Sequence, residues 1–321
     1  MKTEIECFDH KKCIPYRLSV CNSCGINPYR NQDIDFYHAI SMFETKHVLP
    51  ILGKKLNYLL SARMLHNENR FKDYVDILRE YSNKIFVDSG MIGAWKKNDK
   101  DWMNKQDTVI RTGKFFKADI VSMLDLPMEP QMLKGNMTQK NALKQTWINA
   151  EAFRDMGKIG IKKCFVIQGW DKKQYLQSIE KFDELKIWDD ADLIGIGTVC
   201  MRTPKTGLYD ICKFVSEEIH KRTDIPVHTF GIAKPSWIQN LKTFGISSFD
   251  SATAGMCSIF YHFFSENRRI NTYYSNLGSH AKKHLFALNL LVFDDLVKGG
   301  SNHNHINKNL NEYSLIEEGV K

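Results

Sequence analysis

The sequence predicts an α/β protein built as a (β/α)8 barrel of the TIM type, with an N-terminal extension and a C-terminal helical segment. Short apolar runs without polar alternation recur along the middle of the chain, as in parallel strands covered on both faces. Longer amphipathic stretches separate these runs, and carboxylates and glycines gather where the runs end. A doubly wound open sheet is the alternative, but no G-x-G-x-x-G motif follows a predicted strand.

Seven segments have the composition and length of buried strands. A closed barrel needs an eighth strand, and the stretch Arg269–Tyr274 (RINTYY) is the candidate for it. The seven predicted strands are Leu56–Ala62, Ile85–Asp88, Asp119–Leu124, Cys164–Gln168, Asp192–Gly197, Val227–Phe230 and Ile246–Asp250.

Helices are predicted between the strands from their 3.6-residue apolar spacing. The last of them starts at a proline, which fits the first turn of a helix because its missing N–H has no partner there. The predicted helices are Arg70–Ser82, Gln139–Gly157, Lys172–Leu185, Leu208–Arg222 and Pro235–Phe244.

The composition fits one large domain, since 321 residues with 43% hydrophobic content can bury a full core. We expect an extension over residues 1–50, the barrel over 51–297 and a polar tail over 298–321. The N-terminus is charged throughout, unlike a signal peptide, and the run His284–Phe293 is too short for a membrane span, so a cytoplasmic protein without a membrane partner is expected. The net charge of +8 is compatible with a nucleic-acid partner but does not require one.

Polar residues and glycines follow the predicted strands at their carboxyl ends. These ends meet at one face of a parallel barrel, which is where active sites lie. Taken singly, each residue has an ordinary structural explanation, such as a helix N-cap for Asp125 or a turn for Gln168 and Gly169. Together they predict carboxylate chemistry on a flat ligand. The set is Asp88-Ser89-Gly90, Asp125, Gln168-Gly169, Gly197-Thr198, Gly231 and Asp250.

The order of these motifs resembles the tRNA-guanine transglycosylase superfamily. The matching pieces run from Leu56 to Ala254 and read F-V-D-S-G, L-D, V-I-Q-G, I-G-I-G, F-G-I-A-K-P and G-I-S-S-F-D. The resemblance implies a (β/α)8 barrel that exchanges a guanine in a nucleic acid for a 7-deazaguanine. It also implies that the reaction itself needs no metal or organic cofactor.

The resemblance assigns roles to individual residues. Asp250 matches the nucleophile that attacks C1′ of the target nucleotide and holds the sugar as an ester. Asp88 matches the general acid and base. The positions that bind the base would be Ser89, Gly90, Asp125, Gln168, Gly169, Gly197, Thr198 and Gly231.

Some departures from the family bear on the substrate. Only Cys257 follows Asp250, so the zinc site of the bacterial tRNA enzymes is absent, and too few residues remain for the archaeal RNA-binding domains. We therefore expect the phage and bacterial DNA-guanine transglycosylases to be the nearest relatives, with a preQ0-like base entering DNA, and the host cytoplasm as the compartment of a phage-encoded protein. The alternatives are base exchange on tRNA, a small-molecule barrel hydrolase or isomerase, and a non-catalytic partner subunit. The oligomeric state stays open.

Two further groups of residues suggest ligands. Basic residues after the strands are candidates for nucleic-acid phosphates, or else ordinary solvated surface: Arg202, Lys205, Lys234, Arg268 and Arg269. The N-terminal cysteines are candidates for a structural zinc ion, or else reduced thiols: Cys7, Cys13, Cys21 and Cys24, with His10 as an alternative ligand. His228, in the middle of a predicted strand, is expected to be a core histidine.

Overall fold

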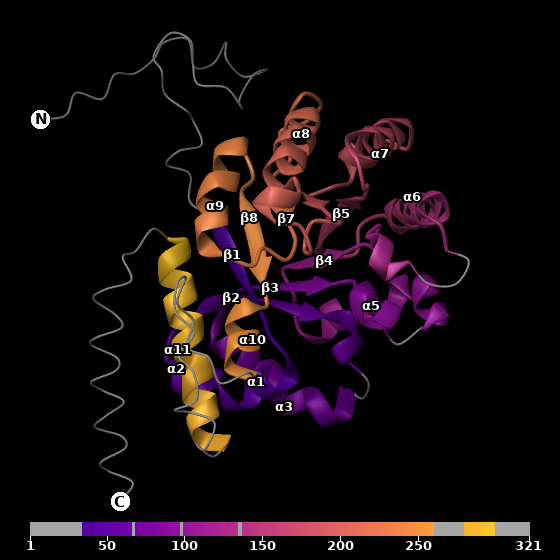
Figure 1. Ribbon diagram of the computed structural model, residues 1–321. Helices are drawn as coiled ribbons and strands as arrows, with labels where there is room; N and C mark the ends of the chain where they lie inside the picture. The colour runs from indigo at the N-terminus through magenta and orange to yellow at the C-terminus, as the bar shows by residue number, and fades with distance from the viewer. Residues whose placement is uncertain (1–33, 66–67, 97–98, 134–136, 260–278, 299–321) are drawn as a thin grey trace, which may run out of the picture.

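Eight parallel strands close into a barrel in chain order, which confirms the predicted (β/α)8 fold (Figure 1). The computed structural model describes residues 34–65, 68–96, 99–133, 137–259 and 279–298. The strands are β1 (Asp35–Ala39), β2 (Leu56–Ser61), β3 (Ser82–Asp88), β4 (Ile120–Ser122), β5 (Lys162–Ile167), β6 (Leu193–Ile196), β7 (Val227–Thr229) and β8 (Ser248–Ser251).

The eighth strand is β1, not the predicted segment Arg269–Tyr274, which lies outside the described residues. β1 pairs with β2 on one side and with β8 on the other, where Tyr37 lies opposite Asp250. Its sequence, DFYHA, has a polar first residue and a histidine between apolar residues, so it does not read as an apolar run. The barrel therefore begins inside residues 1–50, the range that the sequence analysis assigned to an extension.

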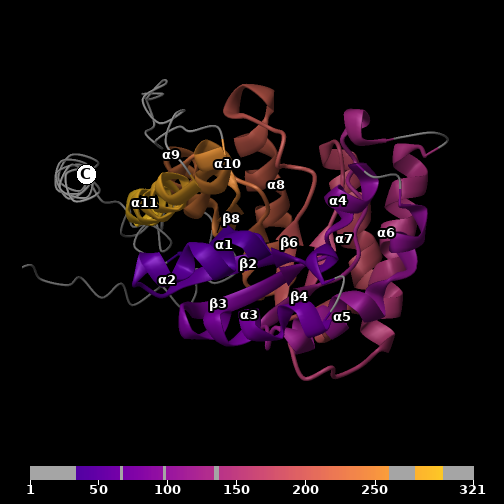
Figure 2. The same cartoon turned by 90° about the horizontal axis from the view of Figure 1, so that it is seen from below.

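Helices surround the barrel, as the view from below shows (Figure 2). The five predicted helices are present with ends that differ by a few residues, and Thr138 and Asp171 cap two of them by accepting a hydrogen bond from the third residue after the cap. The α-helices are α1 (Met42–His47), α2 (Leu49–Leu52), α3 (Glu68–Glu80), α4 (Met91–Lys96), α5 (Gln106–Phe115), α6 (Gln139–Asp155), α7 (Lys172–Glu184), α8 (Leu208–His220), α9 (Pro235–Leu241), α10 (Thr253–Ile259) and α11 (Ser279–Val297).

Six short 3₁₀ turns complete the described elements: Ala62–Met64, Lys100–Asn104, Pro130–Met132, Ile187–Asp189, Pro204–Thr206 and Lys242–Phe244. The expected C-terminal helical segment is α11, which packs against α2, α9 and α10 (Figures 1 and 2). In the part of the chain that the structure describes, no helix has both the length and the apolar character that crossing a membrane requires.

An aromatic layer fills the barrel below its carboxyl-terminal mouth. Residues two apart in a strand share a face, so Phe86 lies on the same side of β3 as Asp88. The rings of Phe86 and His228 lie 5.2 Å apart, and the rings of His228 and Phe230 lie 4.5 Å apart, with Tyr37 within 6.0 Å of His228. This layer forms the floor beneath the side chains at the mouth of the barrel.

Candidate active site

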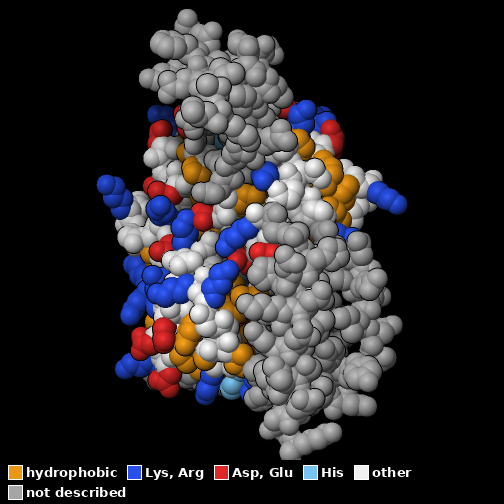
Figure 3. All heavy atoms as spheres, turned by 90° about the vertical axis from the view of Figure 1, so that its left-hand side faces the viewer, with side chains coloured by type: hydrophobic (Ala, Val, Ile, Leu, Met, Phe, Trp, Pro, Cys, Tyr) orange, Lys and Arg blue, Asp and Glu red, His pale blue; other side chains and the backbone are white. Residues whose placement is uncertain are grey.

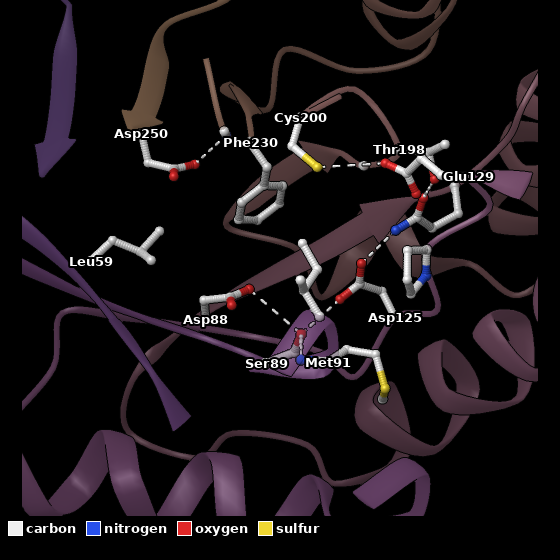
Figure 4. Close-up of a pocket in the computed structure, with 15 residues that line it drawn as sticks. Leu59, Asp88, Ser89, Met91, Asp125, Glu129, Thr198, Cys200, Phe230 and Asp250 are labelled. Carbon is white, nitrogen blue, oxygen red and sulfur yellow. Dashed lines mark hydrogen bonds between the residues drawn. The ribbon is translucent and has the colours of Figure 1, made fainter. Parts of the chain in front are cut away.

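A pocket opens at the carboxyl ends of the strands, and it brings most of the predicted site residues together (Figure 4). It encloses about 590 Å³ of space, a figure that includes solvent at its open mouth. Its apolar walls come from Leu59, Met91, Ile92, Pro127 and Phe230. The predicted residues that line it are Asp88, Ser89, Asp125, Gln168, Gly197, Thr198, Gly231 and Asp250.

Two of the predicted residues, Gly90 and Gly169, do not line the pocket but shape its edges. Gly90 has a φ of +72°, and a Cβ there would lie 2.7 Å from the Ser61 hydroxyl. At Gly169 a Cβ would lie 2.6 Å from the backbone nitrogen of Tyr175 in α7. Both positions need glycine because the backbone turns or packs too tightly for a side chain.

Asp88 is the last residue of β3 and carries the general acid and base role in the prediction. Its Oδ2 accepts the Gly90 N–H at 3.1 Å, and the side chain is half-buried. Burial raises the pKa of Asp88 to about 7, with a further contribution from the nearby charges of Asp125 and Asp250. A carboxyl group with such a pKa can give and take a proton at neutral pH.

Asp125 accepts hydrogen bonds from two other side chains that line the pocket. The Ser89 hydroxyl donates to Asp125 Oδ1 at 2.9 Å, and Gln168 Nε2 donates to Asp125 Oδ2. Burial raises the pKa of Asp125 to about 6, while the two donated hydrogen bonds oppose that rise. The carboxylate keeps lone pairs available for N–H groups of a ligand.

Thr198 fixes the orientation of the Gln168 amide. The Thr198 hydroxyl accepts the Met128 N–H at 2.9 Å, so its own proton goes to Gln168 Oε1. The amide nitrogen of Gln168 must then face Asp125. Thr198 is β-branched and yet has a φ of +54°, a conformation that is costly for such a residue and that surrounding contacts must enforce.

Gly197 lets the strand end approach the Gln168 side chain. A Cβ at Gly197 would lie 2.3 Å from Gln168 Nε2, a distance that no real side chain tolerates. The Gly197 carbonyl accepts the Tyr175 hydroxyl at 2.6 Å, which anchors this backbone to α7.

Asp250 lies on β8, across the pocket mouth from Asp88 (Figure 4). It is buried, with 6% of its surface exposed. Its Oδ1 accepts the Gly231 N–H at 2.9 Å and lies 3.2 Å from His228 Nε2. Gly231 has a φ of +71°, and a Cβ there would lie 2.4 Å from the Cβ of Cys200, so glycine is required for this contact.

Glu129 and Cys200 also line the pocket, although they were not among the predicted site residues. Cys200 Sγ donates to Glu129 Oε1 at 3.5 Å. Burial raises the pKa of Glu129, and it raises the pKa of the Cys200 thiol to about 12, so the thiol stays protonated. Only their positions in the sequence could have indicated a place in the site, because Glu129 follows Asp125 by four residues and Cys200 follows Thr198 by two.

The predicted phosphate-binding residues differ in how far their side chains are exposed and in how many protein groups they contact. The Arg202 guanidinium stacks on the Trp170 ring at 4.4 Å and donates to the carbonyls of Trp170, Thr198 and Thr206. Lys205 and Lys234 are exposed, and Lys234 lies 5.7 Å from the Trp237 ring. Arg268 and Arg269 lie outside the described residues.

The described surface in Figure 3 mixes Lys and Arg side chains with Asp and Glu side chains, so this face does not form a stripe of one sign. The proposed zinc ligands Cys7, Cys13, Cys21 and Cys24 lie outside the described residues. Within the described ranges there is no group of three or more His, Cys, Asp or Glu side chains that suits a metal ion.

A family model described as queuine tRNA-ribosyltransferase matches residues 81–282, which is more than half of the chain. The match starts one residue before β3, and it contains every residue that lines the pocket except Leu59. No curated protein matches the chain.

Proposed function

The chain belongs to the queuine tRNA-ribosyltransferase family, a family of guanine-exchanging pentosyltransferases. From that premise we propose that it replaces a guanine in a nucleic acid with a free 7-deazaguanine, through an ester between Asp250 and the sugar. One observation carries the proposal: Asp88 and Asp250 enter the same pocket from different strands and differ in their surroundings. Asp88 has a pKa raised to about 7, and Asp250 is held at one oxygen by a backbone N–H.

In the first half of the reaction, Asp250 Oδ2 attacks C1′ of the target nucleotide. The O–C1′ bond forms as the C1′–N9 bond breaks, and its electron pair leaves with the guanine. Asp88 gives its proton to the leaving base and becomes a carboxylate. The products of this half are free guanine and the Asp250–sugar ester.

In the second half, the incoming 7-deazaguanine loses its N9 proton to Asp88 and attacks C1′ from the face that guanine left. The ester bond breaks, and its electron pair returns to Asp250. Two inversions retain the configuration at C1′, as in retaining glycosidases. These steps use only side chains of this chain and the two bases.

The base binds between the apolar walls of the pocket and the Asp125 carboxylate with its donors Ser89 and Gln168. Asp125 is an acceptor for adjacent N–H groups on the base edge, such as the N1–H and amino group of guanine. Gly197 and Thr198 contribute backbone groups beside it. The target nucleotide must be turned out of its helix, because C1′ attack with base exchange is impossible inside the stack.

We further propose that the substrate is DNA and that the entering base is preQ0-like. This choice rests on the missing zinc motif, since Cys257 is the only cysteine that follows Asp250 in the sequence. Exchange on tRNA is the alternative. A structural zinc ion at Cys7, Cys13, Cys21 and Cys24 stays a prediction.

The test is an exchange assay with a covalent trap. The protein is incubated with duplex DNA, single-stranded DNA or tRNA together with labelled guanine or 7-cyano-7-deazaguanine, and is then denatured. Label should enter DNA, and a protein–DNA adduct should form with wild type but not with Asp250→Ala. Label in tRNA alone would keep the chemistry and overturn the choice of substrate.

The matched control is Asp189→Asn. Asp189 is exposed and precedes β6, so it lies at the opposite end of the barrel from the pocket. This variant should exchange like wild type. Absence of label and adduct from every nucleic acid with wild type would overturn the proposed function.

A further inference from the structure

His228 is fully buried directly beneath Asp250. Its Nδ1 lies 2.9 Å from the Ser248 hydroxyl, and its Nε2 lies 3.2 Å from Asp250 Oδ1. His228 pairs with Ser248 across the two neighbouring strands, and Asp250 follows Ser248 on the same face of β8. The three side chains therefore stack in a column that ends in the pocket.

The donors in this column follow from the chemistry of its ends. A carboxylate can only accept hydrogen bonds, so His228 Nε2 carries a proton and donates a hydrogen bond to Asp250 Oδ1. In a neutral imidazole the other nitrogen then has a lone pair, which accepts the Ser248 hydroxyl proton. Ser248 thus selects the tautomer of His228 that serves Asp250.

The two oxygens of Asp250 end up in different environments. Oδ1 takes the donors from Gly231 and His228. Among the residues that the structure describes, none donates a hydrogen bond to Oδ2. One oxygen is anchored to the barrel, and the other remains available to the pocket.

We propose that His228 is a positioning residue that locks the Asp250 carboxylate so that Oδ2 alone is presented to the substrate. The inference rests on the proposed function, because it assumes that Asp250 is the nucleophile. Attack on C1′ and the later departure both need the same oxygen in line with the base on the opposite side. A carboxylate that rotates about its Cβ–Cγ bond loses that alignment, and misplacing a reacting atom is costly in rate.

The packing around His228 allows a substitution that removes its hydrogen bonds and keeps its aromatic contacts. The ring lies among Tyr37, Phe86 and Phe230, so His228→Phe keeps an aromatic group in the layer while removing both nitrogens. His228→Gln places an amide N–H where Nε2–H was. Ser248→Ala removes the partner of Nδ1, and Ser247→Ala, whose hydroxyl bonds the Val227 carbonyl on the neighbouring strand, is its matched control.

The measurement is the single-turnover rate of adduct formation between full-length protein and a guanine-containing nucleic acid, together with the KM for the nucleic acid. Losing one hydrogen bond to a charged group should lower the rate roughly 10-fold to 100-fold in His228→Phe, with little change in KM. His228→Gln should recover part of the rate. Ser248→Ala should be slowed by a smaller factor, and Ser247→Ala should behave like wild type.

The outcomes separate the two proposals. Adduct formation in wild type with an unchanged rate in folded His228→Phe would overturn the role of His228 and leave the proposed function standing. If His228→Phe does not fold, His228→Leu, which also removes both nitrogens and keeps an apolar side chain in the layer, takes its place, and an unchanged rate in folded His228→Leu would overturn the role equally. No adduct in wild type would overturn both.

Discussion

The Thr198 hydroxyl donates to the side-chain oxygen of Gln168, and this contact decides which end of the amide faces Asp125. The donor pattern of the pocket is therefore set by a residue whose own backbone has a positive φ. Strained residues of this kind persist only when their surroundings hold them. Here Met128 N–H bonds the hydroxyl of Thr198, and Arg202 Nε bonds its carbonyl at 3.1 Å.

Replacing Thr198 by valine should weaken both folding and base binding. Valine has nearly the same shape but leaves Gln168 Oε1 and the Met128 N–H buried without this partner. The expected loss in the free energy of unfolding is about 1–3 kcal/mol, and the KM for the free base should rise. Denaturant unfolding and exchange kinetics measure the two effects. Thr198→Ser, which keeps the hydroxyl, is the control, and a valine variant with an unchanged KM would contradict the role of this contact.

The pKa of Asp88 predicts how activity depends on pH. Guanine release needs the protonated form of Asp88, whose pKa is about 7, so the single-turnover rate should fall as the pH rises above that value. Asp88→Asn cannot supply a proton and should be slow at every pH. A wild-type rate that stays level from pH 6 to about pH 9 would argue against Asp88 as the acid.

Folding stability should fall with rising pH, in the same direction as the rate of guanine release, because both depend on the protonated form of Asp88. The pKa of Asp88 is about 7 in the fold, above its ordinary value near 3.8, so the folded state holds a proton that the unfolded state releases. The stabilising contribution is complete below about pH 4 and is lost as the pH rises toward 7 and above. Asp88→Asn should therefore gain stability relative to wild type between pH 5 and about pH 8, measured by urea unfolding at both pH values. An identical pH dependence in the two proteins would be incompatible with the raised pKa.

Arg202 should behave as a structural residue and not as a phosphate contact. It stacks on Trp170 and bonds three carbonyls, so Arg202→Ala should lower the melting temperature. Lys205 is exposed and serves as the matched comparison. If Arg202 instead neutralises a phosphate, its removal will reduce the slope of log K against log salt by about one, without a large loss of stability. Binding measured at several salt concentrations distinguishes the two roles.

The sequence was most informative where chemistry depends on strand direction. Asp88, Asp125, Gln168 and Asp250 all follow or end apolar runs, and a parallel barrel brings such ends together whatever the loops do. β1 escaped prediction because Asp35 and His38 interrupt its apolar pattern. The closed barrel itself was predictable, but the strand that closes it was not.

The contacts within the site were not accessible to the same reasoning. His228 was expected to be a core histidine, and it does pack among aromatic rings, but its contact with Asp250 depends on the register between β7 and β8. Glu129 and Cys200 meet through side chains from two loops, which no pattern along the chain encodes. For Arg202, predicted from its place after a strand to contact a phosphate, the bonds from its guanidinium to backbone carbonyls were likewise not readable from the sequence.

Gly197 offers the most direct test of the close packing behind Gln168. A Cβ at this position would lie 2.3 Å from Gln168 Nε2 and 2.5 Å from its Cδ, so Gly197→Ala must displace the amide from Asp125. The displaced amide would also lose its bond to Thr198, and of the two side-chain donors the Asp125 carboxylate would keep only Ser89. We expect weaker binding of the free base and a higher pKa for Asp125, since the Gln168 hydrogen bond favours its ionised form. The base-binding constant measured by calorimetry from pH 5 to about pH 8 checks both effects.

Gly207→Ala is a control away from the pocket, because a Cβ there meets no atom within 4 Å, although its φ of +84° makes a modest loss of stability expected. Equal base binding in Gly197→Ala and wild type would mean that the Gln168–Asp125 contact does not contribute to recognition.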